Sequence, residues 1–494
     1  MANNCKILLV NISELKAEHD TDFPIVAPIG LFYINGYLKS LGYKTKIMQV
    51  ISAKDKKNML EDEMYQNELR KEFILFEADY VCFSLRNLTH IGIGESNDNI
   101  INSFSVSLDR VVIDFFRKFS SVPFIAGGSG FSIDPKIYME FMNIDYGIVG
   151  EGEIALDTLI SCLENKADYR QIPGLVYRQN NNVIVNQNLF VDSLHNMPPM
   201  DTGDMAEFNE LYLPIGHYAS IQTKRGCSFD CVYCSYPWLE GRSYRMRNIS
   251  TVISEIRDIK IRYAAEHFFI VDSVFSTPVD FSVEFCKALI ESELGISWTA
   301  YINPRGLSAK VLDYYKRSGC SKLILTTDAL SEKMLEQYRK GFTMEDVKIC
   351  IGLLKQSDIP FEVHVILGGY GEDNKTVNEA IMFCERYLSD IDVFFQLGVV
   401  FYLCPAAREA LKDDVYFKRV IDSDSLVDIL RNNDYNEIKN YTFFFDDIIE
   451  NRDQAIYEIM YKVISGRRKI FTDNESTTKM VNRIVKQKIL KGEL

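Results

Sequence analysis

Several features that would place this chain in a common class are missing from its sequence. No run of about 18 uncharged apolar residues is present, and a membrane-spanning helix needs at least that length. The N-terminal stretch MANNCKILLV has no basic segment and too short an apolar one for a secretory signal, so we interpret it as a buried strand. The net charge is −14, and the basic residues within 479–491 are expected to form a solvated helix face. Neither a membrane nor a nucleic acid is therefore an expected partner.

Cysteine is not scarce, but its distribution argues against a disulfide framework. The chain has 11 cysteines and no secretory signal, so we expect a reducing, cytoplasmic location. Most of them stand alone, several within apolar segments where cysteine acts as a small buried hydrophobic residue. The isolated ones are Cys5, Cys82, Cys162, Cys286, Cys320, Cys350, Cys384 and Cys404. Only the three cysteines within 227–234 are clustered, and they alone indicate chemistry.

Residues 1–165 alternate strand-like and helix-like segments. The expected strands are 5–10, 44–50, 80–84, 123–126 and 144–149, and the expected helices include 28–41 and 108–119. Buried strands alternating with helices predict an α/β domain with a doubly wound, Rossmann-like parallel sheet. Ligands of such sheets bind at the carboxyl ends of the strands. The informative positions are therefore Arg86, the glycine turn at 127–130 and the segment 150–153.

The rest of the chain divides into three parts. Residues 166–217 are irregular, and we expect a linker with a short hairpin that pairs 174–178 with 183–186. Residues 218–405 contain six strand–helix units, which suggest a partial (βα)6 barrel. Residues 406–494 are mostly helical in pattern and are expected to form a C-terminal helical domain.

The clustered cysteines have the spacing C-x3-C-x2-C, at Cys227, Cys231 and Cys234, in a loop that follows a predicted strand. Three thiolates can hold three irons of a cubane cluster and leave the fourth iron open for a substrate. A structural zinc site is one alternative, but zinc needs four ligands, and Cys286 and His217 are poorly spaced to supply the fourth. An accidental grouping of cysteines is the other alternative.

This motif and its context resemble the radical S-adenosylmethionine (SAM) superfamily, over about residues 218–404. The resemblance implies a [4Fe-4S] cluster and SAM, which the reduced cluster cleaves to a 5′-deoxyadenosyl radical. Weaker marks follow the motif in order. By resemblance, Asp272 faces the methionine part of SAM, Asp328 lies near the ribose, and Gly369 and Glu372 lie beside the adenine, as does the segment 401–405. Around Asp328 the sequence Thr-Thr-Asp-Ala departs from the Gly-x-Glu-Ser that is frequent in the family, which weakens that assignment.

A parallel sheet ahead of such a domain resembles the cobalamin-binding subfamily. The resemblance implies that residues 28–31 open the first helix, and that cobalamin contacts Ser84, Gly127, Gly128, Ser129 and Glu151. Glycine has no Cβ, so backbone at Gly127 and Gly128 can approach a ligand closely. No Asp-x-His-x-x-Gly motif supplies a histidine ligand for cobalt. Arg86 follows the third predicted strand, as in the cobalamin-dependent radical tryptophan methylases, which lack that histidine. A permanently charged arginine is a poor ligand, so it would disfavour a lower cobalt ligand.

The leading hypothesis is therefore a cobalamin-dependent radical SAM methyltransferase acting on a small molecule. A radical SAM rearrangement, dehydration or sulfur-insertion enzyme without methyl transfer is the alternative, and a non-catalytic cobalamin or redox sensor is a third possibility. Tyr301 is the candidate catalytic side chain of the barrel, because it lies at the end of a predicted strand. Arg86 is the second catalytic candidate. The chemistry also implies a reducing partner such as flavodoxin or ferredoxin.

Overall fold

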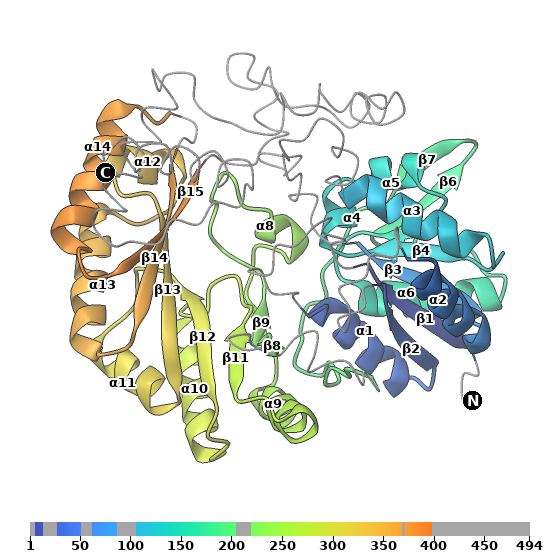
Figure 1. Ribbon diagram of the computed structural model, residues 1–494, viewed down its shortest axis with the longest axis horizontal. Coiled ribbons are helices and arrows are strands. Elements are labelled where there is room, and N and C mark those ends of the chain that lie inside the picture. Colours follow the sequence, from blue (N-terminus) through green and yellow to red (C-terminus); the bar gives the residue numbers. More distant parts are fainter. Residues whose placement is uncertain are drawn as a thin grey trace.

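The computed structural model describes residues 5–12, 27–50, 62–85, 105–203, 219–367 and 371–397. Within these ranges the chain has an α/β fold with two largely parallel sheets, which lie side by side with their helices in Figure 1. No helix of this part is long and apolar enough to cross a membrane. Arg86, Gly369, the motif at 401–405 and the predicted helical region 406–494 lie outside the described ranges.

The first sheet contains seven strands of the described residues, in the order β2-β1-β3-β4-β5-β6-β7. They are β1 (Lys6–Asn11), β2 (Lys44–Gln49), β3 (Tyr80–Ser84), β4 (Phe124–Gly127), β5 (Tyr146–Ile148), β6 (Leu175–Gln179) and β7 (Asn182–Val185). The first five pair in parallel, so their carboxyl ends share one edge. The predicted parallel sheet is confirmed.

Both faces of this sheet are buried, which explains why its strands are continuously apolar. Along β1, Leu8 and Val10 join one apolar core, whereas Ile7 and Leu9 join another. The helices that supply these cores are α1 (Ile29–Ser40), α2 (Glu63–Phe76), α3 (Ser105–Arg117), α4 (Ser129–Ile133), α5 (Pro135–Phe141) and α6 (Gly152–Glu164). Helix α1 ends where predicted, because Gly42 adopts a φ of 88° just beyond the helix.

The hairpin of β6 and β7 belongs to the first sheet and not to a separate connecting segment. β6 pairs antiparallel with β5, and Ile148 lies opposite Leu175. Asn180 and Asn181 form the turn with φ values of 51° and 64°, as a tight hairpin requires. Leu175 is completely buried because it joins one of the two cores of this sheet. The hairpin was correctly predicted, but its pairing with a distant strand leaves no local mark in the sequence.

The second sheet contains six strands of the described residues, all parallel, in the order β15-β14-β13-β12-β11-β8. They are β8 (Ala219–Ile221), β11 (His267–Ile270), β12 (Ser297–Ile302), β13 (Cys320–Asp328), β14 (Phe361–Leu367) and β15 (Asp392–Leu397). A separate small sheet pairs β9 (Lys224–Arg225) with β10 (Arg245–Met246). The predicted strands of this region are confirmed where the structure describes them.

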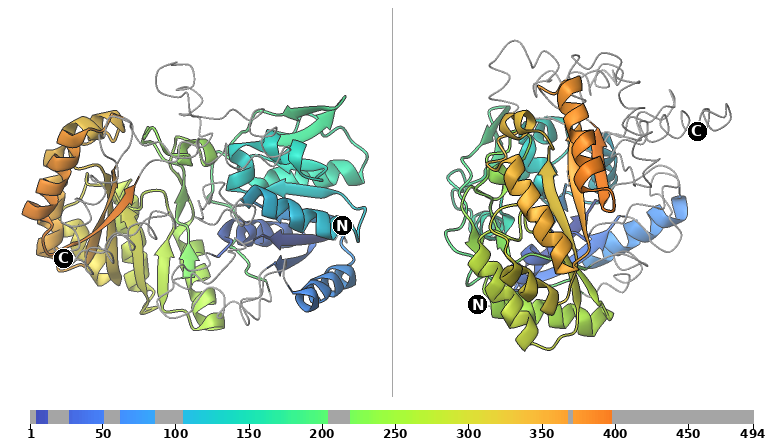
Figure 2. Two further views of the ribbon diagram at one scale, coloured as in Figure 1. Left: turned by 45° about the horizontal axis from the view of Figure 1, so that its top comes forward. Right: turned by 90° about the vertical axis from the view of Figure 1, so that its left-hand side faces the viewer.

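Helices cover one face of the second sheet. They are α9 (Ile249–Tyr263), α10 (Val279–Glu291), α11 (Ala309–Arg317), α12 (Glu332–Gln337), α13 (Met344–Ser357) and α14 (Asn374–Tyr387), and all contribute to the core. The short helix α8 (Tyr236–Leu239) instead contacts α4 of the first part. Side chains such as Leu323, Val363 and Phe395 pack in that core. Figure 2 looks onto these helices in its right-hand view. Alternate residues such as Glu362 and His364 are half-buried, because the side-chain period of a strand directs them to the opposite face.

Candidate active site around the cysteine loop

The cysteine loop begins directly after β9, at a turn that only glycine allows. Gly226 has a φ of 94°, and a Cβ there would lie 2.1 Å from the carbonyl oxygen of Ser243. The amide of Cys227 donates to the carbonyl oxygen of Gly241 (2.9 Å), and that of Cys234 donates to Cys231 (3.1 Å). The backbone that carries the three cysteines is therefore fixed at its start by the β9–β10 pairing.

The three cysteines lie on one short loop, and their thiols are the candidate ligands of a cluster. Cys227 is buried, and Cys231 and Cys234 are half-buried. Burial raises the pKa of Cys234 to about 12 and also raises the pKa of Cys231, so metal binding must displace their protons. In the part of the chain that the structure describes, no three His, Cys, Asp or Glu side chains converge as a metal site. The fit to a cluster with one open iron rests on the chemistry of the three thiols and on their spacing.

Asp272 lies in the loop after β11 and binds the residues that precede the cysteine loop. Its Oδ1 accepts from the amide of Thr223 (2.7 Å), and its Oδ2 accepts from the Thr223 hydroxyl (2.5 Å) and from Lys224 Nζ (2.8 Å). The carboxylate of Asp272 and the ammonium of Lys224 are almost fully buried. The predicted contact of Asp272 with the methionine part of SAM stays a prediction.

The far end of the cysteine loop is held by a second buried group. The Tyr233 hydroxyl donates to Asp328 Oδ2 (2.5 Å), and Lys340 Nζ donates to the Tyr233 oxygen (2.9 Å) and pairs with Asp328. Burial and the Asp328 carboxylate raise the pKa of Tyr233 well above its usual value. Asp328 has a φ of 57° at a register shift of β13, so the strand itself bends to present this carboxylate.

At the carboxyl edge of the first sheet, the predicted cofactor residues lie close together. Ser84 ends β3, Gly127 ends β4, and Ser129 begins α4. Gly128 has a φ of 99°, and a Cβ there would lie 2.5 Å from the Leu85 carbonyl oxygen, so packing within the chain explains this glycine. At Gly127 a Cβ would meet only an ordinary contact, 3.6 Å from an oxygen. Packing against the described residues therefore leaves Gly127 unexplained, and a ligand that needs close backbone approach fits there.

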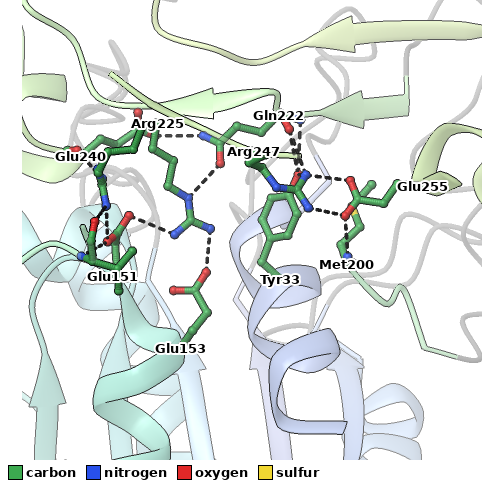
Figure 3. Close-up of polar contacts among 11 residues, drawn as sticks. Tyr33, Glu151, Glu153, Met200, Gln222, Arg225, Glu240, Arg247 and Glu255 are labelled. Atoms are coloured by element: carbon green, nitrogen blue, oxygen red, sulfur yellow. Dashed lines mark hydrogen bonds and ion pairs between the residues drawn. The ribbon is translucent and has the colours of Figure 1, made fainter. Parts of the chain in front are cut away.

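Glu151 lies at the junction of the two sheets, where a network of buried charges joins them (Figure 3). Its carboxylate accepts from Arg225 Nη1 (3.1 Å) and from Arg245 Nη1 (2.7 Å). Burial opposes the charged form, but Arg245 and Arg225 outweigh it and lower the pKa of Glu151. The predicted contact of Glu151 with cobalamin stays a prediction, because both carboxylate oxygens already bind side chains of the second part of the chain.

The remaining predicted residues lie on or after strands of the second sheet. Tyr301 is in β12, and its ring lies edge-on to Phe269 (5.3 Å) and to His364 (5.9 Å). Glu372 is 2% exposed and follows β14. The structure thus brings Asp328 next to the cysteine loop, and it places Ser84, Gly127 and Gly128 at the other sheet.

Sequence reasoning missed several charged residues around the site. His364 Nε2 lies 3.0 Å from Glu362 Oε1, and the other oxygen of Glu362 pairs with Lys322. Burial raises the pKa of Glu362, but His364 and Lys322 outweigh it and lower that pKa. The buried roles of Lys224 and Arg225 were also not predicted. Their position gave a signal, because two adjacent basic residues in a strand directly before Gly-Cys are rarely buried. Lys340 has no such local signal.

Comparison with known proteins identifies the second part of the chain. Residues 221–384, from the end of β8 into α14, match the Radical SAM superfamily model. The chain therefore contains a radical SAM domain, and the match favours the cluster over a zinc site for the three cysteines.

Two relatives extend beyond this domain. The chain is 24% identical over 375 residues to an anaerobic magnesium-protoporphyrin IX monomethyl ester cyclase of Rubrivivax gelatinosus, which covers 74% of this chain and 63% of the relative. It is 25% identical over 325 residues to the hopanoid C-3 methylase of Methylococcus capsulatus, covering 64% of this chain and 56% of the relative. The chain thus spans less than two thirds of the length of these relatives.

The whole described fold is also similar to a solved structure. The radical S-adenosylmethionine methyltransferase TsrM from Kitasatospora setae, solved with tryptophan substrate and a SAM analog, superposes with a TM-score of 0.74. The similarity covers 93% of this chain and 89% of that chain at 19% identity, which shows a shared fold.

Proposed function

We propose that this chain, which carries a radical SAM domain, is a cobalamin-dependent methyltransferase acting on a carbon of a small biosynthetic molecule. One observation carries the proposal. A three-cysteine loop, which follows β8 of one parallel sheet and the short strand β9, occurs in the same chain as the glycine-containing carboxyl edge of another parallel sheet. Cys227, Cys231 and Cys234 would hold the [4Fe-4S] cluster, and its open iron would bind SAM. When bound, the cluster supplies the electron that cleaves SAM, and cobalamin carries the methyl group.

Cobalamin would lie at the carboxyl edge of the first sheet, near Ser84, Gly127, Gly128 and Ser129. Support comes from Gly127, where none of the described neighbours requires the lack of a side chain. Arg86, which lies outside the described residues, would supply a permanently charged group to the cobalamin site where a histidine ligand is lacking, because an arginine is a poor ligand. The hopanoid C-3 methylase among the relatives and the methyltransferase TsrM among the solved structures support the same assignment.

The other site residues have proposed roles within the radical SAM domain. Asp328 would lie near the ribose of SAM, Gly369 and Glu372 would lie beside the adenine, and Asp272 would face the methionine part. Tyr301 would contact the substrate from the sheet face that the helices leave uncovered. The order of these residues along the chain supports the assignment, since they fall in the last two residues of β11 to β14 or in the segments that follow these strands.

The proposed domains are 1–165 for cobalamin, 166–217 as a linker, 218–405 as a partial (βα)6 barrel and 406–494 as a helical domain. The hairpin within 166–217 extends the first sheet, which argues for including it in the first domain. Cluster chemistry also implies a reducing cytoplasmic compartment and an electron donor such as flavodoxin or ferredoxin.

Anaerobic reconstitution with iron, sulfide and hydroxocobalamin tests the proposal. We expect an ultraviolet–visible spectrum with both cluster and cobalamin bands after gel filtration, and formation of S-adenosylhomocysteine on reduction with SAM. Retention of the cluster without cobalamin would overturn the methyltransferase assignment and leave the radical SAM domain intact.

A second candidate is a radical reaction without methyl transfer, such as a rearrangement, dehydration or sulfur insertion. The observation that favours it is the similarity to the anaerobic cyclase, which is not named a methylase. Formation of 5′-deoxyadenosine without S-adenosylhomocysteine would identify this candidate.

A further inference from the structure

Arg225 lies where the two parts of the molecule meet, two residues before the first cysteine of the loop. It is 8% exposed, and every nitrogen of its guanidinium donates a hydrogen bond. Nη2 donates to Glu153 Oε1 (2.6 Å), and Nη1 donates to Glu151 Oε1 (3.1 Å). Nε donates to Gln222 Oε1 (3.0 Å), as Figure 3 shows. A planar guanidinium can bind three acceptors in fixed directions, which a lysine cannot.

Both carboxylates come from the turn between β5 and α6 of the first sheet. Glu151 immediately precedes α6, and Glu153 is in its first turn, where the helix dipole favours negative charge. Their side chains are 8% and 5% exposed in the folded chain. The carboxyl edge of the first sheet therefore supplies two buried charges to a residue beside Cys227.

A second path of contacts reaches the loop backbone. Glu151 Oε2 accepts from Arg245 Nη1 (2.7 Å), and Arg245 Nη2 donates to the carbonyl oxygen of Glu240 (2.6 Å). The Glu240 side chain in turn accepts from the amide of Gly226 (3.1 Å). Glu151 thus binds Arg225, which precedes Gly226. Through Arg245 it also supports Glu240, which binds the amide of Gly226.

The opposite end of the loop has a different anchor. Tyr233 is bound by Asp328 and Lys340, and the amide of Val232 donates to the carbonyl oxygen of Tyr338 (3.3 Å). All of these partners belong to the radical SAM domain. Among the described residues, the first sheet therefore contributes contacts to the Cys227 end of the cysteine loop and none to the Tyr233 end.

We infer that Arg225 is a positioning residue: by binding Glu151 and Glu153, it makes the order of the Cys227 end of the cysteine loop depend on docking of the first sheet. The Tyr233 end keeps its order independently. The inference needs neither cobalamin nor methyl transfer, so it can fail or hold apart from the proposed function.

Hydrogen exchange of the full-length chain, before and after cluster loading, tests it. In a Glu151→Gln, Glu153→Gln double variant, we expect exchange at the Gly226 and Cys227 amides to rise on the order of tenfold or more. The amide of Val232 should keep its protection. The loaded variant should also lose iron faster to a chelator than the parent chain.

Glu255→Gln is the matched control. Glu255 is 3% exposed at the same junction and accepts from Arg247 (2.5 and 2.7 Å) and from the Met200 amide (2.7 Å), with no contact to the loop. The Glu255→Gln substitution removes a charge that is as deeply buried as those of Glu151 and Glu153. It should therefore lower the free energy of unfolding and leave the Gly226 and Cys227 amides protected.

Unchanged protection of Gly226 and Cys227 in the double variant would overturn the inference, as would equal loss in the Glu255→Gln control. Arg225→Lys keeps the charge and loses the three-way geometry, so it should show the same selective exposure to a smaller degree. If the double variant does not fold, Arg225→Lys decides the question by the same amides.

Discussion

The carboxyl edges of the two parallel sheets differ in the kind of residue that forms them. At the ends of β3 and β4, the first edge consists of small residues and backbone contacts: the Leu85 amide donates to the carbonyl oxygen of Gly127, the Gly130 amide to that of Leu85, and the Ser132 hydroxyl to that of Gly128. The second edge consists of buried ion pairs, Lys224 with Asp272 and Lys340 with Asp328. Sheet geometry directs ligands to both edges, so the difference lies in what each edge must do.

An edge of small residues leaves room for a large ligand and presents backbone groups to it, without placing charged side chains against the ligand. An edge of paired charges fixes a loop in one place, because removing one partner leaves the other buried without compensation. The first edge is thus suited to receive a cofactor, and the second to hold the cysteine loop rigidly between two anchors.

The largest effect is expected from the cysteines that the second edge holds. Cys231→Ala should abolish cluster binding, because two thiols cannot hold three irons. Iron and sulfide content after anaerobic reconstitution measures this. Cys350→Ala is the control, since Cys350 is buried in the core of α13 and should keep full iron content. Equal iron in both variants would contradict the ligand assignment.

Local patterns in the sequence predict most of the fold. The predicted bounds of the strands at 80–84 and 297–302 agree with the structure at both ends. Apolar runs bounded by turn residues are local signals, so the sequence alone reveals them. The cysteine spacing likewise indicates the radical SAM domain. Tertiary pairing is not local: nothing near Leu175 reveals its pairing with Ile148, and nothing near Lys340 reveals Asp328. The buried charges of the site were missed for the same reason.

The next effect concerns stability of the second edge. Asp272→Asn should lower the free energy of unfolding by about 3–5 kcal/mol, because the ammonium of Lys224 is 1% exposed and loses its counter-ion. Denaturant unfolding of the cluster-free chain measures the change. Asp313→Asn breaks only an exposed pair with Arg317 and should change the same quantity by less than about 0.5 kcal/mol. A small effect of Asp272→Asn would mean that this edge does not depend on its paired charges.

At the first edge, Gly128→Ala should cost about 1–3 kcal/mol, because its φ of 99° is unfavourable for alanine and its Cβ would lie 2.5 Å from the Leu85 oxygen. Thermal or denaturant unfolding measures this. Gly30→Ala is the control, since a Cβ there meets nothing within 4 Å and alanine favours the helix. Gly127→Ala should leave stability nearly unchanged and reduce cobalamin retention. If Gly127→Ala retains cobalamin fully, backbone approach at that glycine is not part of the cofactor site.

The last expected effect is a pH dependence of stability at the Gly226 end of the cysteine loop, where the Glu240 carboxylate accepts from the Gly226 amide. Burial raises the pKa of Glu240 from 4.5 to about 6, so the folded chain binds this proton more tightly than the unfolded chain. Stability from this group is therefore fully present well below pH 4.5 and is lost as the pH rises through 6, by about 2 kcal/mol in total. Glu240→Gln removes the titration, so the difference in unfolding free energy between variant and parent should change across this window. Groups such as Glu151, whose pKa is lowered, act with the opposite sign in both proteins and cancel in the difference. A difference in unfolding free energy that stays constant from pH 4.5 to 6 would contradict the raised pKa of Glu240. It would show that this carboxyl group, and the Gly226 end of the loop with it, is exposed to water.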